Sequence, residues 1–448
     1  MTTRRDFLRM AAMGAAAMAL PNAGFTLAEK RKPNIIVILS DDHGYASISC
    51  QGGKQIPTPN IDSLAENGLR CTSGYVTCPY CSPSRAGIMT GRYQQRFGHE
   101  DNPGPPKVAA PNFGLPEGEK TMADYLKEKG YATGMIGKWH LGHRPACHPQ
   151  KRGFDEFFGF LTGAHSYTKP GVGTLEPILR GNDEVDEKEY LTDALARESV
   201  SFIDRHKHKP FFLYLAFNAV HHPLEAPAKY KDTFNHFRIA EKRKYAAMLT
   251  SMDDAVGNVL SKVRTAGLEK DTLIIFLGDN GGYRLPGLTP NAPLNGFKGD
   301  AYEGGIRIPF LVQWKGKLPA GVVYEKPLIS LDILPTAVAL ASGKVAPNVE
   351  GVNLLPYLTG EKSQPPHDQL FWRMCNRSAA RVGSWKLVRN GDGSEKLFNL
   401  ADDLSEKKDL AATNPEKLKE LQHAYQEWDA KNIPPRWMDG RKPKPQEH

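Results

Sequence analysis

Cys81 opens a Cys-Ser-Pro-Ser-Arg string that ends at Arg85 and leads into a run with helical character up to residue 91. A Ser-Pro turn before such a run places the cysteine at the N-terminus of a helix. That end of a helix carries partial positive charge and free N–H donors, so it suits an anionic group. The string therefore indicates an anion site that includes Cys81 and Arg85.

The same cysteine also closes a Cys-x-x-Cys motif, Cys78-Pro-Tyr-Cys81. Such motifs lower a thiol pKa at a helix N-terminus and support disulfide exchange, so a thiol–disulfide oxidoreductase using Cys78 and Cys81 is an alternative. A fold of that kind needs on the order of 100 residues. The chain has 448 residues, and most of them would then be unexplained.

Carboxylate and amide side chains directly follow two apolar runs. Asp41 and Asp42 come after residues 35–39, and Asp279 and Asn280 come after residues 272–277. Hard oxygen ligands of this kind suit Ca²⁺ or Mg²⁺ rather than Zn²⁺. A single Asp-Asp pair is usually a turn or a helix cap. Two such pairs after two buried strands instead predict a divalent-cation site.

Basic and imidazole side chains follow other predicted strand ends. Lys138 and His140 stand two residues apart after a short strand and could both face an anion, and Lys298 lies in a glycine-rich loop. Another apolar run, residues 210–217, is followed by His221 and His222. One of these histidines is a plausible acid–base group because its unperturbed pKa lies near neutrality. Spacing alone leaves open which of the two faces the site.

The elements that must position these residues alternate along the chain. Buried strands at 35–39, 210–217 and 272–277 are separated by helical stretches, notably 193–205 and 241–265. This alternation predicts an α/β sandwich around a mostly parallel central sheet flanked by helices. Ligands in open α/β sheets bind beyond the carboxyl ends of the strands. We therefore expect the polar clusters to meet at one edge of one sheet.

Composition changes near residue 363, where short apolar runs alternate with turn residues. These runs predict a small antiparallel sheet, and residues 415–432 read as a charged helix that closes the chain. We expect a catalytic domain at residues 32–362 and a small C-terminal α+β subdomain at residues 363–448.

The N-terminal sequence is typical of an export signal. Arg4 and Arg5 belong to a string that resembles the twin-arginine pattern, and the apolar run at 10–20 is too short to span a bilayer. Small residues near Ala28 offer a cleavage site, so residues 1–28 are predicted to be a signal peptide. No later run is long and apolar enough to cross a membrane. We expect a soluble periplasmic or secreted protein.

Two strings, residues 81–91 and 130–140, resemble the signatures of the formylglycine-dependent sulfatases of the alkaline-phosphatase superfamily, and the match extends from about Lys32 to the C-terminus. The resemblance implies an alkaline-phosphatase-like fold and oxidation of Cys81 to formylglycine (3-oxoalanine). It also implies one Ca²⁺ that contacts the modified Cys81. The implied ligands from the chain are Asp41, Asp42, Asp279 and Asn280. The remaining implied active-site positions are Arg85, Lys138, His140, His221 and Lys298. His221 is preferred to His222 because the family pattern is His-x-Pro-Leu.

The resemblance further implies a sulfuric ester hydrolase. In that scheme the hydrated aldehyde attacks sulfur, while Ca²⁺, Lys138 and Lys298 bind the sulfate oxygens. His221, with Lys298, protonates the leaving alcohol, and His140 helps to remove a proton from the second hydroxyl so that sulfate is expelled. A separate formylglycine-generating or sulfatase-maturating enzyme would convert Cys81 in the cytoplasm before export of the folded protein.

The net charge of the chain indicates what kind of ligand it binds. The chain carries a formal charge of +8, and the loss of residues 1–28, with three arginines and one aspartate, leaves about +6. A basic balance favours acidic ligands. The sequence has no basic run interleaved with aromatics, which opposes nucleic acid, so a sulfated glycan fits better. A phosphate or phosphonate monoester hydrolase and a non-catalytic glycan-binding protein on the same scaffold remain alternatives.

Overall fold

The computed structural model describes residues 31–104 and 113–437. The predicted signal peptide at 1–28 lies outside the described residues. Among the helices in these ranges, none combines the length and the apolar character that crossing a bilayer requires.

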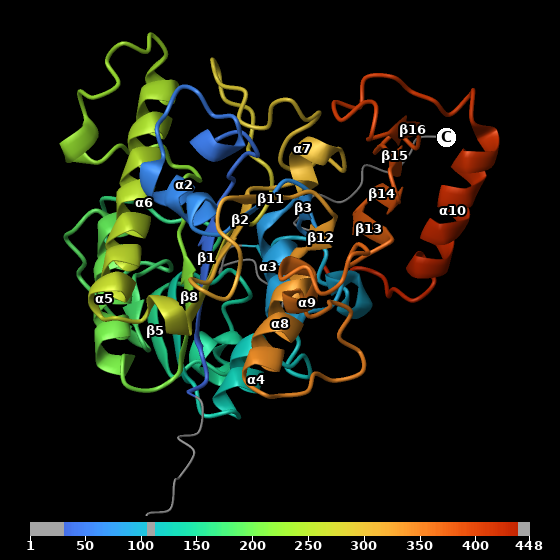
Figure 1. Ribbon diagram of the computed structural model, residues 1–448. Coiled ribbons are helices and arrows are strands. Elements are labelled where there is room, and N and C mark those ends of the chain that lie inside the picture. Colours follow the sequence, from blue (N-terminus) through green and yellow to red (C-terminus); the bar gives the residue numbers. More distant parts are fainter. Residues whose placement is uncertain (1–30, 105–112, 438–448) are drawn as a thin grey trace, which may run out of the picture. The chain divides into compact units, whose positions relative to one another are not determined.

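A ten-stranded sheet forms the centre of the protein (Figure 1). Its five central strands run parallel to one another, whereas β10 and β6, which flank them, run antiparallel to their neighbours. In spatial order the strands are β11 (Val322–Tyr324), β2 (Leu69–Cys71), β10 (Phe310–Gln313), β9 (Thr272–Gly278), β1 (Asn34–Ser40), β8 (Phe211–Ala216), β4 (Ala132–Lys138), β5 (Glu156–Phe160), β6 (Leu179–Arg180) and β7 (Asp183–Glu184). The expected mostly parallel sheet is confirmed for the strands that carry the polar clusters.

Helices cover both faces of this sheet. They are α2 (Pro59–Glu66), α3 (Cys81–Thr90), α4 (Met122–Lys127), α5 (Leu191–His206), α6 (Ala240–Thr265), α7 (Glu303–Ile306), α8 (Ile333–Leu340) and α9 (Leu355–Leu358). In Figure 1, α5 and α6 lie on one side of the sheet and α3, α4 and α8 on the other. The helices expected at 193–205 and 241–265 are α5 and α6, each with its observed ends within two residues of the expected ones.

Strand β1 shows why the sequence builds two layers. Successive side chains of a strand point to opposite faces of the sheet. Ile36 and Ile38 pack in the core that includes α5 and α6, while Ile35, Val37 and Leu39 pack in the core that includes α3, α4 and α8. Because both faces are covered, β1 is a continuous apolar run rather than an alternating one.

A four-stranded antiparallel sheet follows, as the sequence predicts. Its strands are β13 (Gln369–Met374), β14 (Arg377–Val382), β15 (Trp385–Arg389) and β16 (Glu395–Asn399), and α10 (Pro415–Asp429) packs beside them. The helix ends three residues before the expected residue 432. Trp372 of this sheet shares a core with Tyr75 of β3 (Gly74–Tyr75), which pairs with β12 (Leu328–Ile329). The boundary at 362/363 stays a prediction.

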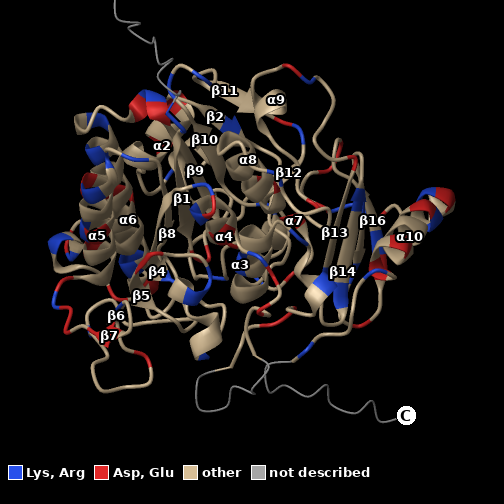
Figure 2. Cartoon of the chain, turned by 90° about the horizontal axis from the view of Figure 1, so that it is seen from below, with Lys and Arg blue, Asp and Glu red and all other residues tan. Residues whose placement is uncertain are grey.

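Charge lies mainly outside the sheet. Figure 2 shows lysine, arginine, aspartate and glutamate along α5, α6 and α10, while the central strands are largely free of them. The acidic and basic residues on these helices are interleaved. The outer helices therefore present a mixed surface, and the charges that matter for chemistry are the buried ones described below.

Gly91 offers a test of how α3 ends. It ends the helix with φ = 64°, in the left-handed region, and a Cβ atom there would lie 3.1 Å from Val349 and 3.2 Å from Leu334. We expect Gly91→Ala to lower the free energy of unfolding by about 1–2 kcal/mol, measured by denaturant titration. Gly118→Ala is the matched control, because its Cβ would meet no atom within 4 Å. Equal effects of the two changes would contradict this account.

Candidate active site

Cys81 is the first residue of α3, and all ten residues of that helix are buried. The N-terminus of the helix, with its partial positive charge, is therefore enclosed in the protein interior at this residue. The Cys81 Sγ atom lies 3.5 Å from Asp41 Oδ1 and 3.8 Å from Asp42 Oδ1. The predicted helix start is confirmed, and it brings the cysteine onto a pair of carboxylates.

Sheet register brings the two acidic pairs together. Ser40 of β1 pairs with Gly278 of β9, so the residues that follow both strands leave the sheet at the same level. The Asp42 backbone N–H donates to Asp279 Oδ1 (3.1 Å), and Asn280 Nδ2 donates to Asp42 Oδ1 (2.8 Å). The expectation that these clusters meet at one sheet edge is met for both pairs.

Each of the three carboxylates has a cationic partner. Arg85 donates through Nε and one terminal nitrogen to Asp279 Oδ2 (3.0 and 2.8 Å). Lys138 Nζ donates to Asp41 Oδ2 (2.5 Å). Lys298 Nζ lies 2.6 Å from Asp42 Oδ1. Five of these six side chains are at most 2% exposed, and Lys298 is 14% exposed, so it is the one nearest to solvent.

The two adjacent histidines take different places. His221 Nε2 lies 3.7 Å from Asp42 Oδ2, at the cluster. The His222 ring instead packs against Tyr283, with 4.5 Å between ring centroids. Burial lowers the pKa of His221 to about 4, and the Asp42 carboxylate opposes that shift. The geometry thus puts His221, rather than His222, beside the carboxylates.

His140 has an unusual backbone. Its φ is 58°, in the left-handed region, and Asp42 shares this property with φ = 54°. Such strain in non-glycine residues clusters at functional sites. The Ser82 hydroxyl donates to the His140 carbonyl (2.6 Å), and the ring lies against Gly163, where a Cβ atom would be 2.5 Å from His140 Nε2. His140 Nδ1 is buried without a hydrogen-bond partner among the described residues.

Burial disfavours the ionised forms of the carboxyl groups in this cluster. It would raise the pKa of Asp42, but the Lys298 and His221 charges outweigh it and hold that pKa well below its usual range. For Asp279, burial and the nearby Asp41 carboxylate raise the pKa despite Arg85. A further positive charge would therefore favour the ionised form of the Asp279 carboxyl.

The donor set fits a hard cation. One ligand atom from each of Asp41, Asp42, Cys81 and His221 lies within 4.8 Å of the others. Asn280 Oδ1 is buried and accepts no hydrogen bond from the described residues, so an amide oxygen is free to coordinate. The Asp279 oxygens accept bonds from Arg85 and from the Asp42 backbone. Several carboxylate oxygens and one amide oxygen are the ligands that Ca²⁺ prefers.

The cysteine motif is poorly suited to redox chemistry. Cys78 and Cys81 are both buried and free. Burial raises the pKa of both thiols, and for Cys81 it does so although Lys138 and Lys298 act in the opposite direction. A redox cysteine needs a lowered pKa and access to its partner. The oxidoreductase alternative therefore has no support in the geometry.

The C-terminal sheet reaches the active site through residues that the sequence did not single out. Arg377 of β14 donates to the Gly299 carbonyl (2.6 Å), directly after Lys298. Lys386 of β15 is fully buried and lies 2.9 Å from both Glu303 of α7 and Glu406. The Arg377–Gly299 and Lys386–Glu303 contacts join residues 78 and 83 positions apart in the chain, so no local sequence pattern predicts them.

The fold and the site define a hydrolase of the alkaline-phosphatase-like α/β class. The sequence model of the Sulfatase family matches residues 33–344. Arylsulfatase J of Mus musculus is 32% identical over 478 residues, which cover 93% of this chain and 79% of that protein. The N-acetylgalactosamine-6-sulfatase of Mus musculus is 32% identical over 385 residues, which cover 79% and 71%.

Solved structures are also similar to this chain. The crystal structure of Ps i-CgsB in complex with k-i-k-neocarrahexaose is 36% identical and superimposes with a TM-score of 0.86, covering 92% of this chain and 96% of that one. A phosphonate monoester hydrolase from Silicibacter pomeroyi has a TM-score of 0.67 at 18% identity, which shows a shared fold alone. The chain belongs to the sulfatase family and is a sulfuric ester hydrolase.

Lys386 offers a test of the contact between the two sheets. We expect Lys386→Met to lower the free energy of unfolding by about 3–5 kcal/mol, because it leaves Glu406 buried without its cation and leaves Glu303 with Arg307 alone. Lys417→Met removes the same charge from an exposed pair with Glu420 on α10 and should cost at most about 1 kcal/mol. Denaturant titration of both variants measures the difference. A small effect of Lys386→Met on the free energy of unfolding would show that the two buried carboxyls do not need this cation.

Proposed function

We propose that this protein hydrolyses sulfate monoesters of a glycan, with Cys81 oxidised to formylglycine and one Ca²⁺ bound beside it. The observation that carries the proposal is the position of Cys81, whose Sγ atom lies 3.5 Å from Asp41 within a buried cluster of three carboxylates and three cations. The nucleophile formed from Cys81 would therefore lie beside the groups that bind an anion.

Asp41, Asp42 and Asn280 would hold the cation, with Asp279 completing the set as the family pattern expects. The unpartnered Asn280 Oδ1 and the raised pKa of Asp279, which results from burial and from Asp41, are the features that favour this assignment. When bound, the cation supplies fixed positive charge for sulfate oxygens, and the hydrated aldehyde supplies the attacking hydroxyl.

The chain's own residues supply the rest. Lys138 and Lys298 have their ammonium groups on the carboxylates that flank Cys81, where they can also donate to sulfate oxygens. Arg85 fixes Asp279 and donates to the Lys138 carbonyl (2.7 Å), so it orients the cluster. His221 and Lys298, both beside Asp42, are assigned to protonate the leaving alcohol. His140 is assigned to remove a proton when sulfate leaves.

A glycan is the proposed substrate class for two reasons. The solved structure with 36% identity holds a carrageenan oligosaccharide, k-i-k-neocarrahexaose. A formal net charge of +8 also favours an acidic partner. Conversion of Cys81 requires a separate maturation enzyme, and the twin-arginine-like string at the N-terminus supports export of the folded protein to the periplasm or beyond.

Protein produced with a formylglycine-generating enzyme should carry an aldehyde at residue 81, detected by mass spectrometry of the peptide that contains it. Sulfate release from 4-nitrophenyl sulfate should fall at least about 100-fold when calcium is chelated, because a charge that stabilises the transition state is removed. Calcium should also raise the melting temperature, since it offsets repulsion between the buried carboxylates. An intact thiol in fully active protein would contradict this mechanism.

The choice between ester classes has a direct test. We expect kcat/KM for 4-nitrophenyl sulfate to exceed that for 4-nitrophenyl phosphate, because the chain belongs to the sulfatase family. Both substrates release the same phenol, so leaving-group chemistry is held constant. The reverse ranking would identify a phosphate or phosphonate monoester hydrolase on this scaffold.

A further inference from the structure

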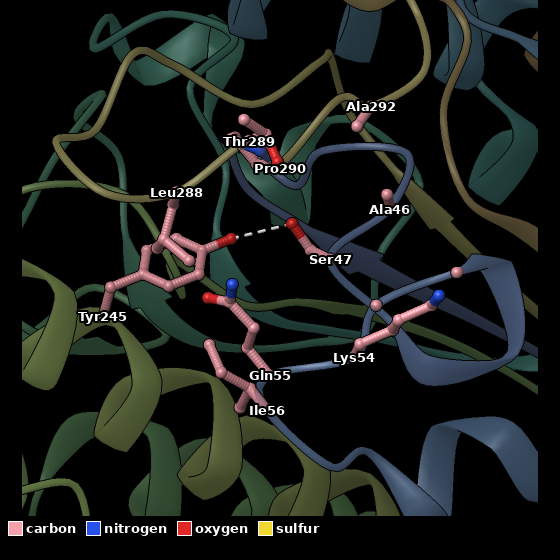
Figure 3. A pocket seen from close by; sticks show the side chains of 12 residues that line it. Ala46, Ser47, Lys54, Gln55, Ile56, Tyr245, Leu288, Thr289, Pro290 and Ala292 are labelled. Carbon is pink, nitrogen blue, oxygen red and sulfur yellow. Dashed lines mark hydrogen bonds between the residues drawn. The ribbon is translucent and has the colours of Figure 1, made fainter. Parts of the chain in front are cut away.

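We propose that a pocket beside the catalytic cluster binds a second, sulfated sugar unit of the substrate. The inference rests on the proposed glycan sulfatase function and extends it to an oligosaccharide substrate. The pocket has a volume of about 200 Å³ (Figure 3). Pockets for drug-sized ligands measure roughly 300–1,000 Å³, so this one suits a single sugar ring.

The pocket and the active site share two loops. One wall is the loop after β1, which begins with Asp41 and Asp42 and lines the pocket from Ala46 onward. Another is the loop after β9, which begins with Asp279 and lines the pocket from Leu288. Four residue-to-residue steps lead from Asp42 to Ala46, which limits the distance between their Cα atoms to about 14 Å. One oligosaccharide can therefore reach both places.

Hydrogen bonds hold these loops together. The Ala46 N–H donates to the Pro290 carbonyl (2.7 Å). The buried Asn291 side chain exchanges two hydrogen bonds with the backbone of Gly282 (2.8 and 2.9 Å), and the Lys298 N–H donates to the same Gly282 carbonyl (3.1 Å). The pocket wall is thus connected through one residue to the active-site lysine.

The pocket lining combines apolar and polar groups, as the binding of a sugar requires. The Tyr245 ring, Leu288 and Ile56 provide apolar surface for the carbon face of a ring. The Tyr245 hydroxyl is hydrogen-bonded to Ser47 (2.9 Å), and Figure 3 shows the Gln55 amide pointing toward that pair. Hydroxyl and amide groups of this kind can bind sugar hydroxyls.

Charge selects a sulfated sugar over a neutral one. Lys54 is exposed at the rim, and the twelve lining residues include this cation and no acidic side chain. No ion pair joins Lys54 to any carboxylate among residues 31–104 and 113–437. A surface ammonium without an acidic neighbour is available to an anionic group of the ligand.

The experiment compares small and large substrates in matured protein. The probes are 4-nitrophenyl sulfate and the hexasaccharides of carrageenan, chondroitin sulfate and heparin. Lys54→Gln should raise KM for the hydrolysed hexasaccharide about tenfold more than it raises KM for the aryl sulfate, because one charge-assisted contact is lost. Gln55→Trp, which fills the pocket, should do the same. Lys54→Arg should retain the wild-type ratio.

Lys344→Gln is the matched control, because it removes an exposed lysine. The preceding residue, Gly343, lies against Lys129, which stands between α4 and the start of β4 and thus at the opposite edge of the sheet. Lys344→Gln should leave both substrates unaffected. If the aryl sulfate is hydrolysed while Lys54→Gln and Gln55→Trp leave every hexasaccharide KM unchanged, the pocket is not a sugar subsite and the sulfatase function stands. If no probe releases sulfate, the proposed function fails and the subsite fails with it.

Discussion

The structure depends on the mutual neutralisation of charges inside the protein. Asp41, Asp42 and Asp279 are buried at the ends of two strands, where an unpaired carboxylate would cost several kcal/mol. Arg85, Lys138 and Lys298 come from a helix, a third strand and a loop to compensate them. Removal of any one partner would leave a buried charge uncompensated, so the geometry of this cluster and the fold are specified together.

The sequence predicts the part of this arrangement that follows from parallel strands. Apolar runs such as residues 35–39 and 272–277 are recognisable as strands buried on both faces, and parallel strands share one carboxyl edge. Asp41 and Asp279 could therefore be expected to meet. The choice between His221 and His222 could not be made from spacing, because it depends on the turn after β8. The antiparallel outer strands are likewise set by long connections rather than by residue pattern.

The C-terminal sheet is a second feature beyond sequence reasoning. Its strands could be expected from turn residues and short apolar runs, but their partner could not. Arg377 holds the carbonyl beside Lys298, and Lys386 joins Glu303 to Glu406 in the interior. The loop that carries Lys298 is therefore held by contacts from the C-terminal sheet as well as from the central one. Contacts between segments distant in the chain leave no periodic signal, so they could not be predicted from residue pattern.

The burial of α3 has a consequence for biogenesis. Cys81 is 1% exposed, and every residue of its helix is enclosed by the sheet and by neighbouring helices. An enzyme that oxidises this side chain needs it in its own active site, which the folded protein does not permit. If Cys81 is oxidised as proposed, the reaction must take place on the nascent or unfolded chain, before α3 docks. The time between synthesis and folding would thus determine what fraction of the molecules ever becomes active.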